Sequence, residues 1–317
     1  MQKLKGELML FIAAVIWGIS FLFQKVGMDY IGPLTFTMFR FGIGSLAILP
    51  VVWFNSRRHR SAGSAAVCIE SEDHINEQIN GNTPFTDRRL ITGGIFIGAA
   101  NFAGSVLQQI GIAYTTVGKA GFLTAMDLVF VPFILVIIHQ KVHPLTWTGV
   151  VVACIGMYCL SITGGFHMSA GDLLCLGGAF GFAVQIVLIN YYTEHVDCIK
   201  LAFYEFAVTF ILSAIFTPVF EHVDMGMVIK CAGPLLFTGV MEVCVAFTLE
   251  IVALKYAPPA IGTIIMSMES VFAALAGFLF LKELMTKRQT AGCVIMLIAF
   301  IIAQIPEMKD DADARKE

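Results

Sequence analysis

FLTAMDLVFVPFILV (residues 122–136) and IIMSMESVFAALAGF (residues 264–278) are two apolar stretches that each hold one carboxylate, Asp127 and Glu269, in the middle. The two acids are 142 residues apart in a chain of 317 residues. Hydrophobic residues make up 57% of the chain and charged residues only 14%, whereas about a quarter of an average soluble protein is charged. Mean hydropathy is +0.81. These values indicate a membrane protein, in which an acid inside an apolar segment is costly.

The apolar segments predict an all-α integral membrane protein. A helix needs about 20 apolar residues to cross the hydrocarbon core of a bilayer. The segments are continuously apolar instead of alternating at every second residue, so they are helices and not barrel strands. We predict ten transmembrane helices, at residues 7–26, 33–54, 91–112, 118–138, 144–163, 171–192, 200–220, 233–254, 258–281 and 288–305.

The chain contains an internal repeat. YTTVGKAGFLTAMDLVFVPF (114–133) aligns without gaps to YAPPAIGTIIMSMESVFAAL (256–275), and earlier in each half Arg40 aligns with Glu205. Each half has five predicted helices, and an odd number of crossings makes the second half enter the membrane inverted. We predict two inverted five-helix repeats, with this division of the chain: 1–163 with a mobile cytoplasmic loop at 55–90, 164–306, and a charged cytoplasmic tail at 307–317.

The distribution of Lys and Arg predicts the orientation of the protein in the cell membrane. These residues collect in cytoplasmic loops. With the N-terminus inside, thirteen of the twenty lie on the cytoplasmic side, so both termini are predicted to be cytoplasmic. The eight cysteines form no CxxC pattern, and neither a disulfide framework, a metal site nor a cofactor is expected.

The sequence resembles the drug/metabolite transporter superfamily, in its EamA-type branch of ten-helix permeases, over nearly its whole length. AAVIWGISFLFQKVG (13–27), FRFGIGSLAILP (39–50) and MESVFAALAGFLFLKE (268–283) resemble the first, second and ninth helices of that family. The last match sets Glu269 at an acidic position of the family pattern, but Ser270 replaces the usual proline. The resemblance implies a permease for amino acids, other metabolites, sugars or drugs.

Asp127 and Glu269 are the first candidates for a substrate-binding or coupling site. Both are predicted at about 14 to 17 Å from the nearer end of their helices, close to the bilayer centre. There an ionised acid must face a wet cavity, pair with a cation or become neutral. Hydrogen bonding between helices is the alternative. Arg40 and Glu205 are further candidates, as gates or as groups that steer a zwitterion, and both are predicted shallow enough to reach interfacial water.

The remaining candidates are five side chains: three polar groups expected to face the same central space, a tryptophan expected in the cavity wall, and Lys119, which could bind a carboxylate substrate from the outer side of the cavity. Each has a purely structural alternative, such as core packing, interhelical hydrogen bonding or snorkelling of a lysine to the headgroups. Glu250, which aligns with one of them, is assigned to interhelical hydrogen bonding because it lies close to the inner end of its helix. The five are Trp17, Lys119, Gln108, Asn101 and Glu242.

These features predict a secondary transporter that moves a small metabolite, such as an amino acid or a related amphipathic solute, by alternating access. The sequence has no phosphate-binding loop, so transport is expected to be coupled to protons or to exchange. The alternatives are a membrane-embedded enzyme that uses paired carboxylates and a passive channel; we expect no enzyme. The predicted partners are a small-molecule substrate and the lipid bilayer, with no nucleic acid, and the protein is expected to be a monomer or homodimer.

Overall fold

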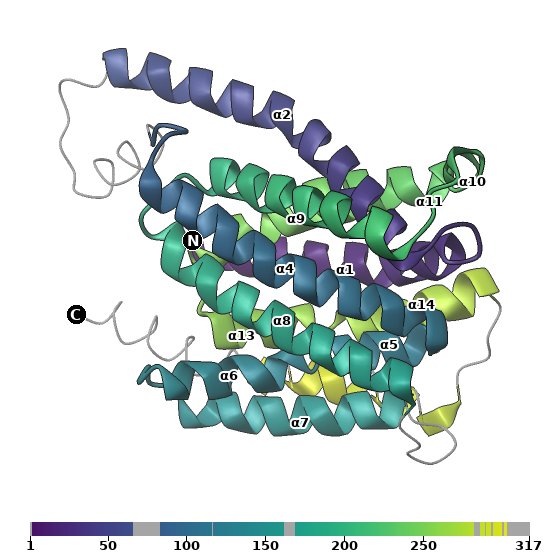
Figure 1. Ribbon diagram of the computed structural model, residues 1–317. Coiled ribbons are helices and arrows are strands. Elements are labelled where there is room, and N and C mark those ends of the chain that lie inside the picture. Colours follow the sequence, from purple (N-terminus) through teal and green to yellow (C-terminus); the bar gives the residue numbers. More distant parts are fainter. Residues whose placement is uncertain are drawn as a thin grey trace, which may run out of the picture.

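A computed structural model describes residues 2–65, 83–115, 117–161, 169–281 and, except 289, 293 and 300, 286–302. Within these ranges the regular structure is helical and contains no strand (Figure 1). Eight helices in these ranges are long and apolar enough to cross a membrane. They coincide with eight of the ten predicted spans and confirm a multi-pass, all-α membrane protein. The other two, 144–163 and 288–305, coincide with the shorter apolar helices Pro144–Cys159 and Thr290–Ala299, and the count of ten stays a prediction.

The helices lie alongside one another as a bundle (Figure 1). Several predicted spans are built from more than one helical element. The elements are α1 (Gln2–Gly27), α2 (Pro33–Ala65), α4 (Arg88–Tyr114), α5 (Val117–Thr124), α6 (Asp127–Ile137), α7 (Pro144–Ser161), α8 (Ala170–Thr193), α9 (Cys198–Phe220), α10 (Met225–Lys230), α11 (Ala232–Phe237), the π-helix η1 (Thr238–Phe247), α12 (Thr248–Leu254), α13 (Pro259–Met266) and α14 (Glu269–Leu281).

Two spans are interrupted at places that correspond in the predicted repeat. A turn at residues 125–126 separates α5 from α6, and a turn at 267–268 separates α13 from α14. Asp127 is therefore the first residue of α6, and Glu269 is the first residue of α14. A negative charge at a helix N-terminus interacts favourably with the helix dipole, so both acids occupy a position that stabilises them.

A third span changes its helical type in the middle. The segment from Ala232 to Leu254 passes from α11 into the π-helix η1 and then into α12. π-Helical turns are rare and occur often at functional sites. Glu242 lies in η1, and Glu250 lies in α12.

Small residues allow the helices to approach closely. α4 packs along α8, and a Cβ atom added to Gly178 of α8 would lie only 2.9 Å from the carbonyl oxygen of Gly104 in α4. In a membrane, where lipid is as apolar as the side chains, such close packing drives helix association. α2 and α4 also pack against α9, and α1 packs against α14, so the two halves of the chain interlock.

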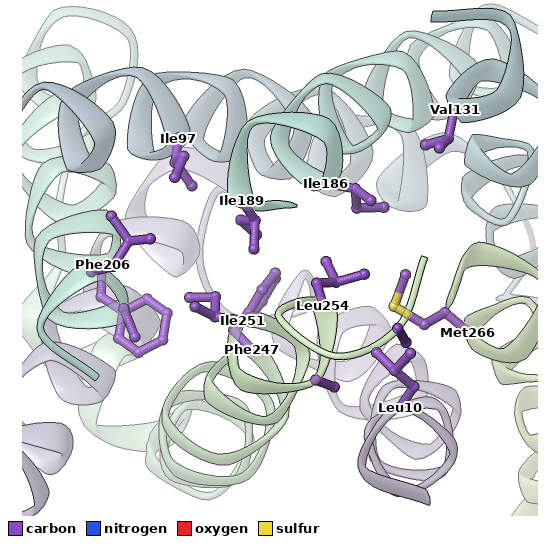
Figure 2. Packing of buried hydrophobic residues seen from close by; sticks show 14 of the residues in the cluster. Leu10, Ile97, Val131, Ile186, Ile189, Phe206, Phe247, Ile251, Leu254 and Met266 are labelled. Atoms are coloured by element: carbon purple, nitrogen blue, oxygen red, sulfur yellow. The ribbon is translucent and has the colours of Figure 1, made fainter. Parts of the chain in front are cut away.

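An apolar cluster fills the space between helices of both halves. Figure 2 shows side chains of this cluster converging from several helices. Ile97 comes from α4, Ile186 and Ile189 from α8, Phe247 from η1 and Met266 from α13. Ile186, Phe247 and Met266 of this cluster also line the cavity described below.

The predicted loop at 55–90 is wrong for its first residues. α2 continues to Ala65 and α4 begins at Arg88, where Asp87 accepts hydrogen bonds from two backbone N–H groups of the first turn. Residues 55–65 contain Arg and Ala, which favour helices, and Arg57 stacks over the ring of Trp53 one turn earlier, at 3.7 Å. Residues 66–82, like the predicted tail at 307–317, lie outside the described residues.

Candidate functional site

A cavity lies between the interrupted helices. It contains about 510 Å³ of space between atoms, its open mouth included. Ten of the helical elements contribute to its wall, from both halves of the chain. The lining residues are Trp17, Phe21, Gln24, Arg40, Ser105, Gln108, Thr124, Asp127, Phe182, Gln185, Ile186, Glu242, Phe247, Glu250, Met266 and Glu269.

The two acids that mark the repeat line this one cavity. Asp127 and Glu269 are both buried in the bundle, each at the start of a half-helix. The Oδ1 atom of Asp127 has no hydrogen-bond partner among the described residues. Interruption of both spans at these positions thus brings two carboxylates, one from each half, to the same polar space.

Arg40 forms an ion pair on the cavity wall. Its Nη1 atom donates to Oε1 of Glu242 at 2.7 Å, and the side-chain amide of Gln24 donates to the same oxygen at 3.1 Å. The guanidinium also lies 5.2 Å from the ring of Phe41. Arg40 is only 1% exposed, so the expectation that it reaches interfacial water is wrong. Helix packing buries the residue more deeply than its distance from the helix end indicated.

Glu205 belongs to a hydrogen-bonded cluster directly behind the cavity wall. Its Oε1 atom accepts from Nδ2 of Asn101 at 2.8 Å and from Nε2 of Gln185 at 2.7 Å. Ser105 in turn donates to Oδ1 of Asn101 at 3.0 Å. Glu205 has no exposed surface, so its predicted access to interfacial water is also wrong. Gln185 and Ser105 connect this cluster to the cavity, because both line it.

Trp17 and Gln108 line the cavity as two further candidates. The Trp17 ring packs edge-on against Phe247 at 5.3 Å between centroids, and its Nε1 has no hydrogen-bond partner among the described residues. Gln108 donates to Thr124 Oγ1 at 3.1 Å. Lys119 lies within α5, but its side chain lies outside the part of the chain that the structure describes.

Glu250 was not among the site residues predicted from the sequence. Assigned there to interhelical hydrogen bonding, Glu250 instead lines the cavity, and its Oε2 atom has no partner among the described residues. The repeat contained the signal, because Glu250 aligns with Gln108, which was a candidate. The position of Glu250 was predicted by counting residues along a straight α-helix. The span passes through a π-helix instead, so that prediction was wrong. Gln24, Ser105, Thr124 and Gln185 were missed as well, because single polar residues in apolar segments carry no distinctive pattern.

The composition of the cavity wall resembles that of small-molecule sites. The described residues contain no group of three or more His, Cys, Asp or Glu arranged to hold a metal ion. The cavity combines aromatic and aliphatic walls with a few polar groups, which is typical of small-molecule sites. Several of these polar atoms lack partners within the described structure: Trp17 Nε1, Gln24 Oε1, Arg40 Nε, Asp127 Oδ1, Glu242 Oε2 and Glu250 Oε2.

Comparison with known proteins identifies relatives along the whole chain. An uncharacterized transporter of Archaeoglobus fulgidus is 30% identical over 308 residues, which cover 96% of this chain and 87% of the relative. The uncharacterized transporter YwfM of Bacillus subtilis is 23% identical over 97% of both chains. A protein of known crystal structure shares the fold, with a TM-score of 0.69 at 16% identity over 96% of this chain and 98% of that one.

A family model also matches nearly the whole chain. The model describes the EamA-like transporter family, and it matches residues 4–162 and 169–304. These matches cover the helices that line the cavity in both halves. The resemblance seen in the sequence is therefore confirmed: the chain belongs to the EamA-like transporter family.

Proposed function

We propose that this membrane transporter is a secondary carrier that moves a small amphipathic metabolite, such as an amino acid or a related compound, by alternating access. The observation that carries the proposal is the pair of interrupted helices, one in each half, whose acids line one cavity. Discontinuous helices at the interface of two repeats are a common construction of solute sites in secondary transporters.

We further propose ten transmembrane helices arranged as two inverted repeats, residues 1–163 and 164–306, with both termini cytoplasmic. The backbone at the two interruptions supports the repeat. Met126 N donates to Leu123 O at 3.3 Å, and 142 residues later Met268 N donates to Ile265 O at 3.1 Å. The two ranges matched by the family model support the same division. Two halves that enclose a site can rock against each other and expose it alternately to each side.

The energy for uphill transport comes, in this proposal, from a proton gradient or from exchange of a second solute. No GxxxxGK[ST] motif occurs in the sequence, which removes the usual phosphate-binding loop of ATP-driven pumps. Carboxyl groups at the cavity support either coupling, because a carboxyl can hold a proton or a cationic group of a solute.

Counterflow in proteoliposomes tests the proposal. Purified protein is reconstituted with one unlabelled metabolite inside, and a labelled trace of the same metabolite is added outside, for each member of a metabolite panel. A carrier accumulates the label transiently above equilibrium. Simple equilibration without overshoot indicates a channel, and chemical conversion of the solute indicates an enzyme; either outcome contradicts the proposal.

The variant Glu269→Gln tests the role of the cavity acids. We expect it to reach the membrane at the wild-type level but to lose transport or its dependence on pH, because the amide keeps the shape and cannot ionise. Glu194→Gln, which removes an exposed acid at the end of α8, is the control and should transport normally. Transport by Glu269→Gln at wild-type rates at every pH would show that the acid has no such role.

A further inference from the structure

Acidic side chains outnumber basic ones in the described lining of the cavity. Its described side chains include four carboxylic acids, Asp127, Glu242, Glu250 and Glu269, but one basic group, Arg40. Arg40 and Glu242 form a 2.7 Å ion pair, although Arg40 Nε and Glu242 Oε2 have no hydrogen-bond partner among the described residues. Both members of this pair are nearly fully buried, so the positive charge of Arg40 is already neutralised at short range. Three acids remain.

These three acids come from three different helices and have no basic partner among the described side chains. Asp127 belongs to α6, Glu250 to α12 and Glu269 to α14. Among the side chains that the structure describes, none of the three forms an ion pair with Lys or Arg. Asp127 Oδ1 and Glu250 Oε2 are moreover buried without a hydrogen-bond partner in this part of the chain. A buried carboxylate left in this way costs several kcal/mol of solvation unless a counter-charge or a proton satisfies it.

A solute with a carboxylate would meet two N–H donors that lack partners among the described residues, Trp17 Nε1 and Arg40 Nε, but also the three acids. Its negative charge would approach these acids, and the guanidinium in the described lining already faces Glu242. Like charges brought together in a desolvated site cost several kcal/mol, so this arrangement rejects anions and discriminates against zwitterions. An ammonium group, in contrast to a carboxylate, suits three neighbouring acids. It carries a positive charge and three N–H donors, enough for one hydrogen bond to each of three carboxylates.

The rest of the lining suits an apolar body attached to the ammonium group. Trp17, Phe21, Phe182 and Phe247 contribute aromatic surface, with Ile186 and Met266 between them. Aromatic faces attract cations as well as apolar groups, so this part of the wall does not oppose the charge of the solute. Trp17 Nε1 is left as a free donor within the described structure.

We propose that the cavity selects organic cations, namely protonated amines with an aromatic or aliphatic body and no carboxylate, and that Asp127, Glu250 and Glu269 bind the ammonium group. This inference rests on the proposed transport function and narrows its substrate class from amphipathic metabolites in general to amines. Arg40 and Glu242 take no direct part in recognising the charge of the solute and instead hold α2 against η1.

Three compounds with the same phenyl ring and two-carbon chain test the inference: phenethylamine is a cation at neutral pH, phenylalanine a zwitterion and 3-phenylpropionate an anion. Each is titrated into the purified full chain in detergent, and the apparent Tm is recorded, because a ligand of the folded state raises it. We expect a saturable rise with phenethylamine, at a half-saturating concentration at least about tenfold lower than that of phenylalanine, which corresponds to about 1.4 kcal/mol. With 3-phenylpropionate we expect no rise.

Variants assign the effect to the three acids. Glu250→Gln and Asp127→Asn should each raise the half-saturating concentration of phenethylamine about tenfold or more, because each variant removes one charged partner of the ammonium group. Glu194→Gln, the exposed control, should bind as the wild type does. Two variants in different helices are used so that misfolding of one leaves the other as a test. If both fold and bind the amine with wild-type affinity, the three acids do not recognise it and the inference is wrong.

The remaining outcomes separate this inference from the proposed function. Tighter binding of phenylalanine or 3-phenylpropionate, equal binding of all three compounds, or no Tm shift with amines from ethylamine to tryptamine overturns the selection of amines. Counterflow of any other solute would then still support a carrier. Conversely, amine binding without counterflow of the bound amine supports the site and contradicts the carrier.

Discussion

Arg40 and Glu205 occupy equivalent positions in the two halves, yet they are held in different ways. Arg40 of α2 pairs with a carboxylate, Glu242 in η1, whereas Glu205 of α9 is held by two amides, Asn101 of α4 and Gln185 of α8. In the predicted repeat, α4 corresponds to the span that contains η1. Both halves therefore connect equivalent helices through a buried polar contact, but one contact is an ion pair and the other is a carboxylate with neutral donors.

The two contacts thus differ in chemistry although they join helices that correspond in the predicted repeat. The ion pair contains a fixed positive charge that must stay compensated, since a single buried charge is very costly. The amide cluster contains one ionisable group, Glu205. Its neutral donors can hydrogen-bond to the Glu205 carbonyl or carboxylate oxygen whether or not the group is charged. Stability should therefore depend strongly on the first contact and weakly on the second.

The largest effect is expected from Arg40→Met. The variant leaves Glu242 buried without its cation, which should lower the free energy of unfolding by about 3 to 5 kcal/mol. Denaturant unfolding in mixed micelles measures the change. The double variant Arg40→Met with Glu242→Met should regain most of the loss, because apolar residues replace both members of the pair. Equal stability of the single and double variants would contradict the importance of the ion pair.

A smaller effect is expected from Glu205→Gln on the other side of the comparison. The new amide keeps an oxygen that can accept from Asn101 and Gln185, so two charge-assisted hydrogen bonds become neutral ones. We expect a loss of about 1 kcal/mol in the same unfolding experiment. A loss as large as that of Arg40→Met would show that both halves depend equally on a buried charge, and the distinction between them would fail.

The smallest effect is expected from Ser105→Ala. Ser105 Oγ donates to Asn101 Oδ1 at 3.0 Å and thereby orients the amide that holds Glu205. Hydrogen bonds between side chains in membrane proteins contribute about 0.6 kcal/mol on average, and we expect a loss of this size. A double-mutant cycle with Asn101→Ala measures the coupling. If the cycle shows no coupling between the two positions, Ser105 does not contribute to the cluster.

The fold class and part of the site were predictable from the sequence because they depend on local composition. Apolar segments of sufficient length predicted the spans, and the recurrence of an acid after 142 residues predicted that Asp127 and Glu269 belong together. The structure confirms the helical membrane fold, and both acids line the cavity. The inverted arrangement of the halves stays a prediction.

The geometry within the spans was not predictable in the same way. Neither interruption contains Gly or Pro: its turn residues are Ala125 and Met126 in one half and Ser267 and Met268 in the other, which are ordinary in helices. Ser270, in place of the expected proline, still lies directly after an interruption. Tertiary packing, and not local preference, therefore sets these breaks. The same packing buries Arg40, whose depth along the chain indicated contact with interfacial water.

The π-helix η1 has a consequence for the register of the span that contains Glu242 and Glu250. Eight residues separate these acids, and on a regular α-helix that spacing rotates two side chains about 80° apart, because each residue turns the chain by about 100°. The wider turns of a π-helix advance by a smaller angle per residue, so the same eight residues complete close to two full turns. Both acids thus reach the cavity. The length of this segment matters as much as its composition: deletion of a single residue between Glu242 and Phe247 would turn one acid away from its neighbours without removing any side chain that lines the cavity.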